Sequence, residues 1–280
     1  MISVDASKCT RCGRCIADCV VQVIHRTSGG IPAIPEQAER YCMHCQHCLA
    51  VCPAGALSCD GHTPEQCVPA GPLPDETRMM NLIRQRRSIR QFEQKNLPSE
   101  VMEKLVASLR WIPTGCNDHR LVFTVIDDLA KMEPFRARMV KITRFLIKSG
   151  IMRIVYPGYK RFEESMLGGR DFVFRNAPHM IVVASPKDAP CGRFDASIAL
   201  TQFDLYAQSL GVGTCWCGFA YYAFTLNRGM RSLLHLPKGY KVGAVMLFGP
   251  PAVNYPRATD PEPYTVIRPE GKPSTAAVPG

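Results

Sequence analysis

Hydrophobic and polar positions along this chain of 280 residues predict helices and strands in its second part. Apolar residues recur at helical spacing over residues 99–110, with Ser99 placed to cap the helix. Runs rich in β-branched residues at 121–126, 179–184 and 242–248 predict strands. A long helix is expected over 196–210, where Gly211 occupies the position of a C-terminal cap. Residues 131–166 are expected to be mainly helical, so the region after residue 76 mixes the two kinds of element.

The first 60 residues follow a different pattern, an approximate internal repeat that is dense in cysteine. Each half has a cysteine run followed by a short apolar stretch, at 20–24 and at 54–57. Residues 61–76 are rich in proline and glycine, which is typical of a linker. The proline-rich residues after Gly249 predict a tail extended over a surface. We therefore divide the chain into a small domain (1–60), a linker (61–76) and a large domain with its tail (77–280).

The composition is that of a globular protein, with 46% hydrophobic and 21% charged residues. Apolar runs stay well below the ~18 residues of a membrane span, and residues 1–8 hold no apolar core of a signal peptide. We therefore expect a cytoplasmic protein without membrane contact. In that compartment the 14 cysteines are not expected to form disulfides, because thiol pools keep such bridges reduced.

The net charge of +10 is concentrated after residue 60. Residues 1–60 hold five Lys/Arg and five Asp/Glu, whereas residues 131–175 hold eleven Lys/Arg and four Asp/Glu. A basic face attracts nucleic acid, acidic membrane or an anionic cofactor or partner, and it is equally typical of a solvated helix. No RNA- or DNA-binding motif accompanies the charge, so no nucleic-acid partner is expected.

Eight of the cysteines lie in two runs that share the pattern C-x-x-C-x-x-C-x-x-x-C. The first run consists of Cys9, Cys12, Cys15 and Cys19, and the second of Cys42, Cys45, Cys48 and Cys52. Three cysteines spaced by two residues can wrap one face of a cubane, and in two-cluster ferredoxins the fourth cysteine reaches the other cluster. That rule assigns Cys52 to the first [4Fe–4S] cluster and Cys19 to the second.

A zinc ribbon is the alternative to these clusters, but it needs only two C-x-x-C pairs and has no use for the third cysteine of each run. Residues 1–60 resemble the bacterial-type two-cluster ferredoxin, with Val20 where the first run often has proline. Cys59 and Cys67 fall outside the runs and are expected to be ordinary thiols of the domain edge and the linker.

Four motifs follow the linker: residues 86–92 (RRSIRQF), 113–119 (PTGCNDH), 210–219 (LGVGTCWCGF) and 245–250 (VMLFGP). The first offers guanidinium and hydroxyl donors that suit a phosphate group. In this order and at these distances, the motifs resemble the nitroreductase family of FMN enzymes over residues 77–258. The resemblance implies an α+β fold, so the chain is expected to pair a small ferredoxin-like two-cluster domain with a nitroreductase-like FMN-binding α+β domain.

The resemblance further implies a homodimer that holds FMN at the subunit interface. By motif it assigns FMN binding to Arg86, Arg87, Ser88, Arg90, Asn117, Cys217, Gly218 and Arg257. The arginines and the serine are expected at the phosphate and ribityl chain, and the asparagine is expected to come from the partner subunit. Backbone groups of the Cys-Gly pair are expected beside the reactive edge of the ring. Because the flavin carries the chemistry, no catalytic side chain is expected.

Together these features predict an oxidoreductase that passes electrons from two [4Fe–4S] clusters to FMN and on to a small organic acceptor. The acceptor is expected to be a nitro compound, a quinone or an enone, and the external donor a ferredoxin or an NAD(P)H-linked dehydrogenase. In a first alternative, NAD(P)H reduces FMN directly while the clusters export electrons or are structural. A second alternative is a zinc-bearing module that binds nucleic acid. Cys116 and Cys215 are expected near the flavin, either as small buried hydrophobes or as redox groups.

Overall fold

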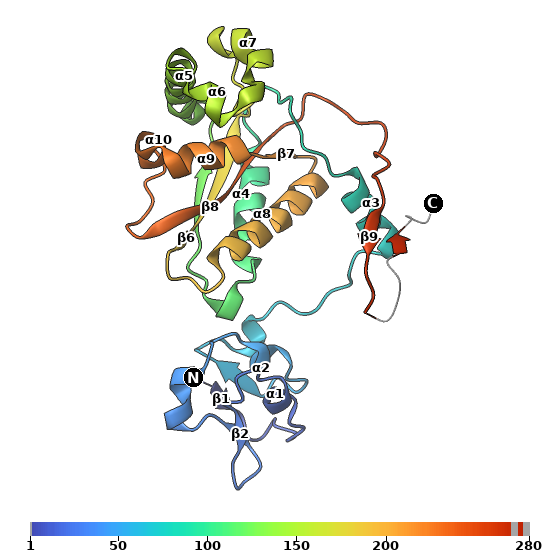
Figure 1. Cartoon of the computed structure of the whole chain (residues 1–280). Coiled ribbons are helices and arrows are strands. Elements are labelled where there is room, and N and C mark those ends of the chain that lie inside the picture. Colours follow the sequence, from blue (N-terminus) through green and yellow to red (C-terminus); the bar gives the residue numbers. More distant parts are fainter. Residues whose placement is uncertain (1, 270–273, 277–280) are drawn as a thin grey trace.

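The computed structural model describes residues 2–269 and 274–276. The predicted tail includes 270–273 and 277–280, which lie outside the described residues. Figure 1 shows the small domain below the large one, with the linker running up one side of the molecule to α3 (Glu76–Gln85). Asp75 caps α3 by accepting a hydrogen bond from the Arg78 N–H at 2.9 Å, so the helix begins within the last two residues of the predicted linker.

The small domain reproduces its sequence repeat in three dimensions. Its elements are β1 (Ile2–Val4), α1 (Arg14–Ala17), β2 (His25–Arg26), β3 (Pro32–Ala33), the 3-10 helix η1 (Glu36–Tyr41), α2 (His47–Ala50) and β4 (Leu57–Cys59). The strands β1 and β4 pair antiparallel and so join the two ends of the domain. The buried residues Cys15, Leu49, Leu57 and Cys59 form its core.

The large domain is built on one antiparallel sheet with the strand order β5-β6-β8-β7. These strands span Val122–Ile126 (β5), His179–Pro186 (β6), Gly213–Trp216 (β7) and Tyr240–Gly249 (β8). The helices are α4 (Ser99–Ser108), α5 (Glu133–Lys148), α6 (Ile151–Val155), α7 (Glu163–Leu167), α8 (Gly192–Ser209), α9 (Gly218–Leu226) and α10 (Arg228–Ser232). The tail adds the short antiparallel pair β9 (Tyr264–Val266) and β10 (Ser274–Ala276).

Alternate side chains of the central strand β6 pack into two separate cores, because successive side chains of a strand point to opposite faces of the sheet. Met180 and Val182 pack into the core covered by α5, α9 and α10. Ile181 and Val183 pack into the core covered by α4 and α8. Helices on both faces of the sheet therefore leave β6 buried throughout, which is why its sequence is a continuous apolar run.

The α+β fold and the predicted strands are confirmed, and the helices differ in detail. The helix expected at 196–210 is α8, which starts four residues earlier, at Gly192. A Cβ at Gly192 would lie 2.3 Å from the Ser185 hydroxyl, so only glycine fits at this position. The cap prediction for Ser99 is wrong: Pro98 is the N-cap and Ser99 is the first helical residue. Gly211 does follow α8 in the left-handed conformation, with φ 73°.

The basic segment 131–166 is helical as predicted and forms α5, α6, a 3-10 turn and α7. Within the described residues, no helix is both long and apolar enough to cross a membrane.

Candidate functional site

Two small cavities in the small domain collect the eight cysteines of the two runs. Cys9, Cys12, Cys15 and Cys52 line the first cavity, and Cys19, Cys42, Cys45 and Cys48 line the second. Each cavity therefore takes three cysteines from one run and the fourth from the other. This grouping is the one that the two-cluster rule predicts from the spacing.

The local backbone explains why each run wraps a cavity. Gly13 and Gln46, the residues directly after the second cysteine of each run, adopt left-handed φ values of 76° and 60° and cap the one-turn helices α1 and α2. Backbone N–H groups also point at sulfur: that of Ala56 donates to Cys52 Sγ at 3.3 Å. Thiolates enclosed by apolar residues and N–H donors suit [4Fe–4S] clusters, so the residues present fit the predicted groups.

Cys59 belongs to this site although it lies outside both runs. It lines the second cavity and is 1% exposed. Burial, with Cys48 and Asp60 nearby, raises the pKa of the Cys59 thiol to about 12, so it stays protonated. Its position at the end of the short strand β4, close behind the second cysteine run, was the available signal in the sequence. Cys67, by contrast, is an exposed thiol of the linker.

In the large domain, the arginine motif lies beside the glycine-rich loop. The Ile89 N–H donates to the Thr214 carbonyl at 2.7 Å, which attaches the segment to the edge strand β7. A Cβ at Gly213 would lie 2.8 Å from Ile89, so this close approach requires glycine. The motif at the end of β8 joins them, since the Glu93 N–H donates to the Pro250 carbonyl at 2.9 Å. The fold thus brings together three of the four sequence motifs.

The three arginines of this motif lie in different electrostatic surroundings. Arg86 lies 3.5 Å from the carboxylate of Asp204, which is buried on α8. Arg87 donates to Thr259 Oγ1 at 2.8 Å and so attaches the tail, where Arg257 is exposed two residues earlier. Arg90 is exposed. Ser88 is half-buried between them.

The Cys-Gly pair lies at the junction of β7 and α9. The buried Cys217 thiol donates to the Val173 carbonyl at 3.2 Å, and its N–H donates to the Val245 carbonyl at 3.0 Å. Burial raises the pKa of Cys217 to about 12. Gly218 is exposed and begins α9, whose first N–H groups carry partial positive charge. Both polar groups of Cys217 are therefore engaged by the protein, while Gly218 is accessible.

Arg175 is a candidate that the sequence analysis missed. Burial raises the pKa of Cys215, whereas the positive charges of Arg175 and Arg90 act in the opposite direction. Arg175 has a left-handed φ of 54° and lies four residues before β6 begins at His179. A basic residue in front of the sequence Asn-Ala-Pro was the available signal.

Asn117 lies on the turn that follows α4, and it contacts the small domain. Its Nδ2 donates to the backbone carbonyls of Met43 and His44, each at 3.0 Å. Its predicted contact with FMN across a subunit interface stays a prediction. The neighbouring Cys116 is exposed, in contrast to the buried Cys215.

An apolar cavity of about 330 Å³ lies between α5, α6, α7 and α9. Aromatic rings line it: Tyr156 and Phe172 both pack against Phe219, with ring centroids 5.9 and 5.2 Å away. Because Phe219 directly follows Gly218, this cavity adjoins the loop at which the flavin is expected. At its rim Arg136 pairs with Asp171, with an N–O distance of 3.3 Å.

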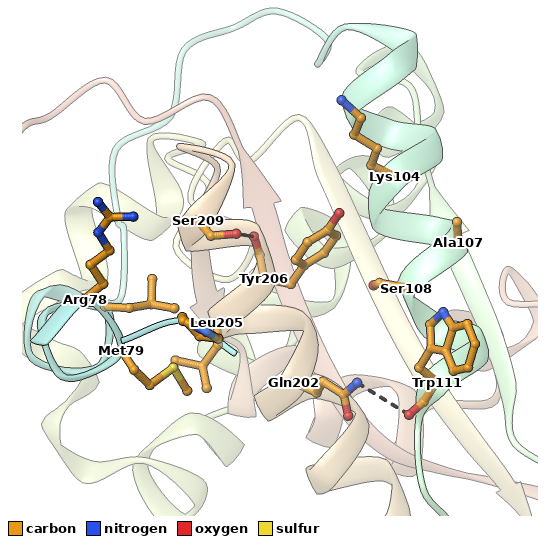
Figure 2. Close-up of a pocket in the computed structure, with 12 residues that line it drawn as sticks. Arg78, Met79, Lys104, Ala107, Ser108, Trp111, Gln202, Leu205, Tyr206 and Ser209 are labelled. Atoms are coloured by element: carbon orange, nitrogen blue, oxygen red, sulfur yellow. Dashed lines mark hydrogen bonds between the residues drawn. The ribbon is translucent and has the colours of Figure 1, made fainter. Parts of the chain in front are cut away.

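A second, wider hollow is the groove of about 910 Å³ shown in Figure 2, where α3 and α4 lie on either side of α8. Met79 and Leu205 meet on one side, and Trp111 lies on the other, 62% exposed. The Gln202 amide donates to the Trp111 carbonyl at 3.4 Å across the floor of the groove. This face of the domain is therefore apolar and open.

Comparisons with known proteins match both parts of the chain. The nitroreductase family profile matches residues 83–250, and that of a 4Fe-4S dicluster domain matches residues 8–57. A nitroreductase with bound FMN from Bacteroides fragilis is 18% identical with a TM-score of 0.55, over 70% of this chain and 100% of that one. One with bound FMN from Desulfitobacterium hafniense is 24% identical with a TM-score of 0.51, over 66% and 94%.

The FMN-dependent nitroreductase NfnB from Mycobacterium smegmatis, solved with NADPH, is 17% identical with a TM-score of 0.50, over 66% of this chain and 96% of that one. No curated protein sequence matches this chain. At these identities the solved structures show a shared fold.

Proposed function

The chain belongs to the nitroreductase family and carries a 4Fe-4S dicluster domain. From this premise we propose that it is an iron–sulfur flavoprotein oxidoreductase. It passes electrons from two [4Fe–4S] clusters through FMN to an organic acceptor. The observation that carries the proposal is the grouping of the cysteines around two cavities, in a chain whose second part has a nitroreductase fold. Two electrons from an external donor and two protons from solvent reduce one acceptor molecule. Flavin suits this task because it exchanges both single electrons and electron pairs.

In this proposal the residues around β7 bind and orient FMN. Arg90 holds the phosphate, together with Arg175, because the charges of both act on Cys215 in the glycine-rich loop and a guanidinium matches phosphate geometry. Arg86 forms an ion pair with Asp204 on α8, and this pair positions the start of the arginine motif beside the FMN site. Ser88, Arg87, Asn117 and Arg257 remain proposed contacts on the family resemblance.

The N-terminus of α9 stabilises the negative charge of reduced FMN. Its free N–H groups at Gly218 and Phe219 are accessible, and a helix N-terminus favours an anion. The buried thiols of Cys215 and Cys217 have raised pKa values and stay neutral, so they add no competing anion beside the ring. The side chains thus orient the cofactor and set its electrostatics, and none is proposed as a nucleophile.

The proposed acceptor is a nitro compound, a quinone or an enone. The cavity between α5–α7 and α9 supports a flat, apolar molecule, because aromatic side chains line it and it adjoins Gly218. The external donor is proposed to be a ferredoxin or an NAD(P)H-linked dehydrogenase. A cytoplasmic location is proposed because the cysteines outside the two runs are thiols that form no disulfide.

We propose that the chain forms a homodimer through the face that contains the groove of Figure 2. Along α8 the large side chains of Phe194 and Ile198 are 72% and 44% exposed, and Trp111 borders the groove. A second copy would cover this face, since contiguous exposed apolar surface of this kind is typical of interaction sites.

The proposal is tested by mixing the fully loaded protein anaerobically with a reduced ferredoxin and following the flavin absorbance. We expect the flavin to bleach on the timescale of turnover. The control is Cys45→Ser, which removes a ligand of the second cluster and should keep FMN while slowing the bleaching at least tenfold. Iron near eight atoms per chain, as two cubanes require, and one FMN should accompany the activity. Absence of bleaching in a protein with full iron and FMN content would contradict the electron path.

A direct NAD(P)H input is the second candidate, favoured by the structurally similar M. smegmatis enzyme solved with NADPH. It predicts that NADPH bleaches the flavin equally fast in the Cys45→Ser variant and in the unaltered protein. The same stopped-flow experiment therefore separates the two inputs.

A further inference from the structure

The side chain of Asn117 has a fixed direction between the two domains. Its Oδ1 lies 2.6 Å from Nε2 of His119, and its Nδ2 donates to the carbonyls of Met43 and His44. Carbonyl oxygens only accept, so the Met43 and His44 carbonyls determine which way the amide faces, and the Asn117 Oδ1 then accepts from the His119 Nε2–H. Both amide hydrogens are therefore directed at the loop between Cys42 and Cys45.

One of these carbonyls leads directly to a cysteine sulfur. The Met43 C=O and the His44 N–H belong to the same peptide unit, and this N–H donates to Cys42 Sγ at 3.4 Å. A donor on the carbonyl side of a peptide polarises its N–H, so consecutive hydrogen bonds strengthen one another. Asn117 thus acts through one peptide on Cys42, which lines the second cavity.

The large domain holds this turn in an unfavourable conformation. Cys116, Asn117 and His119 have left-handed φ values of 55°, 54° and 47°, a region that few residues other than glycine occupy. The turn is fastened by the Gly115 N–H, which donates to the buried carboxylate of Asp195 at 2.9 Å. In Figure 1 the segment after α4 faces the small domain. Strained residues gathered at one contact are typical of functional positions.

We infer that Asn117 is a positioning residue that docks the second cluster against the large domain and raises the reduction potential of that cluster. The inference rests on the proposed function, which places a [4Fe–4S] cluster on Cys42 and its partners. Hydrogen bonds to cluster sulfurs help to set the potential, and a stronger N–H···S bond favours the more negative, reduced state.

The second cluster is then the point from which electrons leave the small domain. Held by Cys19, Cys42, Cys45 and Cys48, this cluster would supply one electron at a time to FMN, and an external donor of the ferredoxin class would replace each electron by way of the first cluster. Both amide hydrogens of Asn117 are engaged by the cysteine loop of the same chain, which gives the side chain a role at that loop.

The test compares Asn117→Ala and Asn117→Asp with the unaltered holoprotein in an anaerobic redox titration followed by EPR. The aspartate keeps the size of the side chain but cannot donate its hydrogen bonds. Cys45→Ser identifies the signal of the second cluster. We expect both Asn117 variants to shift that signal to more negative potential, to leave the first cluster unchanged and to slow electron transfer from cluster to flavin at least tenfold.

The matched control is Asn96→Ala, which removes hydrogen bonds of similar number from the same domain, to Asp128 and Leu129. It should leave both cluster potentials and the transfer rate unchanged. Unaltered potentials in both Asn117 variants, or a shift confined to the first cluster, would overturn the inference. Missing iron or FMN in the unaltered protein would instead refute the proposed function. If one Asn117 variant loses iron, the other supplies the comparison, and hydrogen exchange of the loop around His44 reports docking independently.

Discussion

The two domains of this chain differ in what holds them together. Among the described residues, the small domain has one core of four buried residues, whereas the large domain has three, of nineteen, thirteen and four. A domain of about 60 residues buries too little apolar surface for comfortable stability, and such domains commonly use metal sites. The comparison indicates that the proposed clusters contribute to the stability of the small domain, while the large domain folds around its own cores.

Removal of iron should have the largest effect, because it should unfold the small domain and leave the large one folded. Chelation under reducing, anaerobic conditions is expected to unfold residues 2–60 while the large domain stays folded, because the cysteine cavities then lose the cluster that joins their walls. Hydrogen exchange read by mass spectrometry should show full exchange in the small domain and unchanged protection in β6 and β8. Retained protection across residues 2–60 without iron would contradict the view that the clusters stabilise the small domain.

A cavity created by mutation in the core of the large domain should destabilise that domain and leave the small one unchanged. Phe203 is 1% exposed and packs edge-on against Phe248, with ring centroids 5.3 Å apart. Phe203→Ala is expected to lower the free energy of unfolding of the large domain by about 3–5 kcal/mol and to leave the iron content unchanged. Urea denaturation, followed by fluorescence of Trp111 and Trp216, measures this change. The control Phe145→Ala, 65% exposed on α5, should cost about 0.5 kcal/mol or less.

The large domain also buries a titratable group. His179 is fully buried, and its Nε2 accepts the Leu97 N–H at 3.0 Å. Burial lowers its pKa from 6.5 to about 4, against the opposing effect of Asp127 and Asp128. As the pH falls below 6.5, the unfolded chain binds a proton that the folded chain does not bind. The free energy of unfolding should therefore fall, by about 3 kcal/mol at pH 4.

His179→Phe should flatten this dependence, although it also removes the acceptor for Leu97 and so lowers stability at pH 7. The measurement is the slope of the unfolding free energy between pH 6.5 and pH 5, read by the same tryptophan fluorescence. Equal slopes in the variant and the unaltered protein would show that His179 does not titrate as its burial implies.

The smallest expected effect is a change in the affinity for FMN that leaves the folding stability unchanged. Arg90→Ala should weaken FMN binding by about tenfold to a hundredfold, the worth of one charge-assisted hydrogen bond, and leave the stability of the FMN-free domain unchanged. Arg84→Ala, a neighbouring exposed arginine on α3, is the control and should leave FMN binding unaltered. Calorimetric titration of the FMN-free protein with FMN measures both. Equal affinities in the two variants would remove Arg90 from the proposed site.

Both family resemblances found in the sequence are confirmed by the matches at residues 8–57 and 83–250. The strands β5, β6 and β8 were also predictable, because β-branched runs are local signals. The helix α3 was not predicted, since each of its residues keeps some exposure and its apolar face borders an open groove. The grouping of the cysteines agrees with the prediction, and their role as ligands stays a prediction.

The sequence by itself determined the features that depend on near neighbours, namely the cysteine spacing, the order of the four motifs and the period of the strands. Only the tertiary structure decided how distant residues meet. Asn117 reaches Met43 across 74 positions, and Arg86 pairs with Asp204 on α8, while its contact with the FMN phosphate stays a prediction. Spacing along a chain fixes contacts within a turn of backbone, whereas contacts between distant segments depend on how the sheet and helices pack.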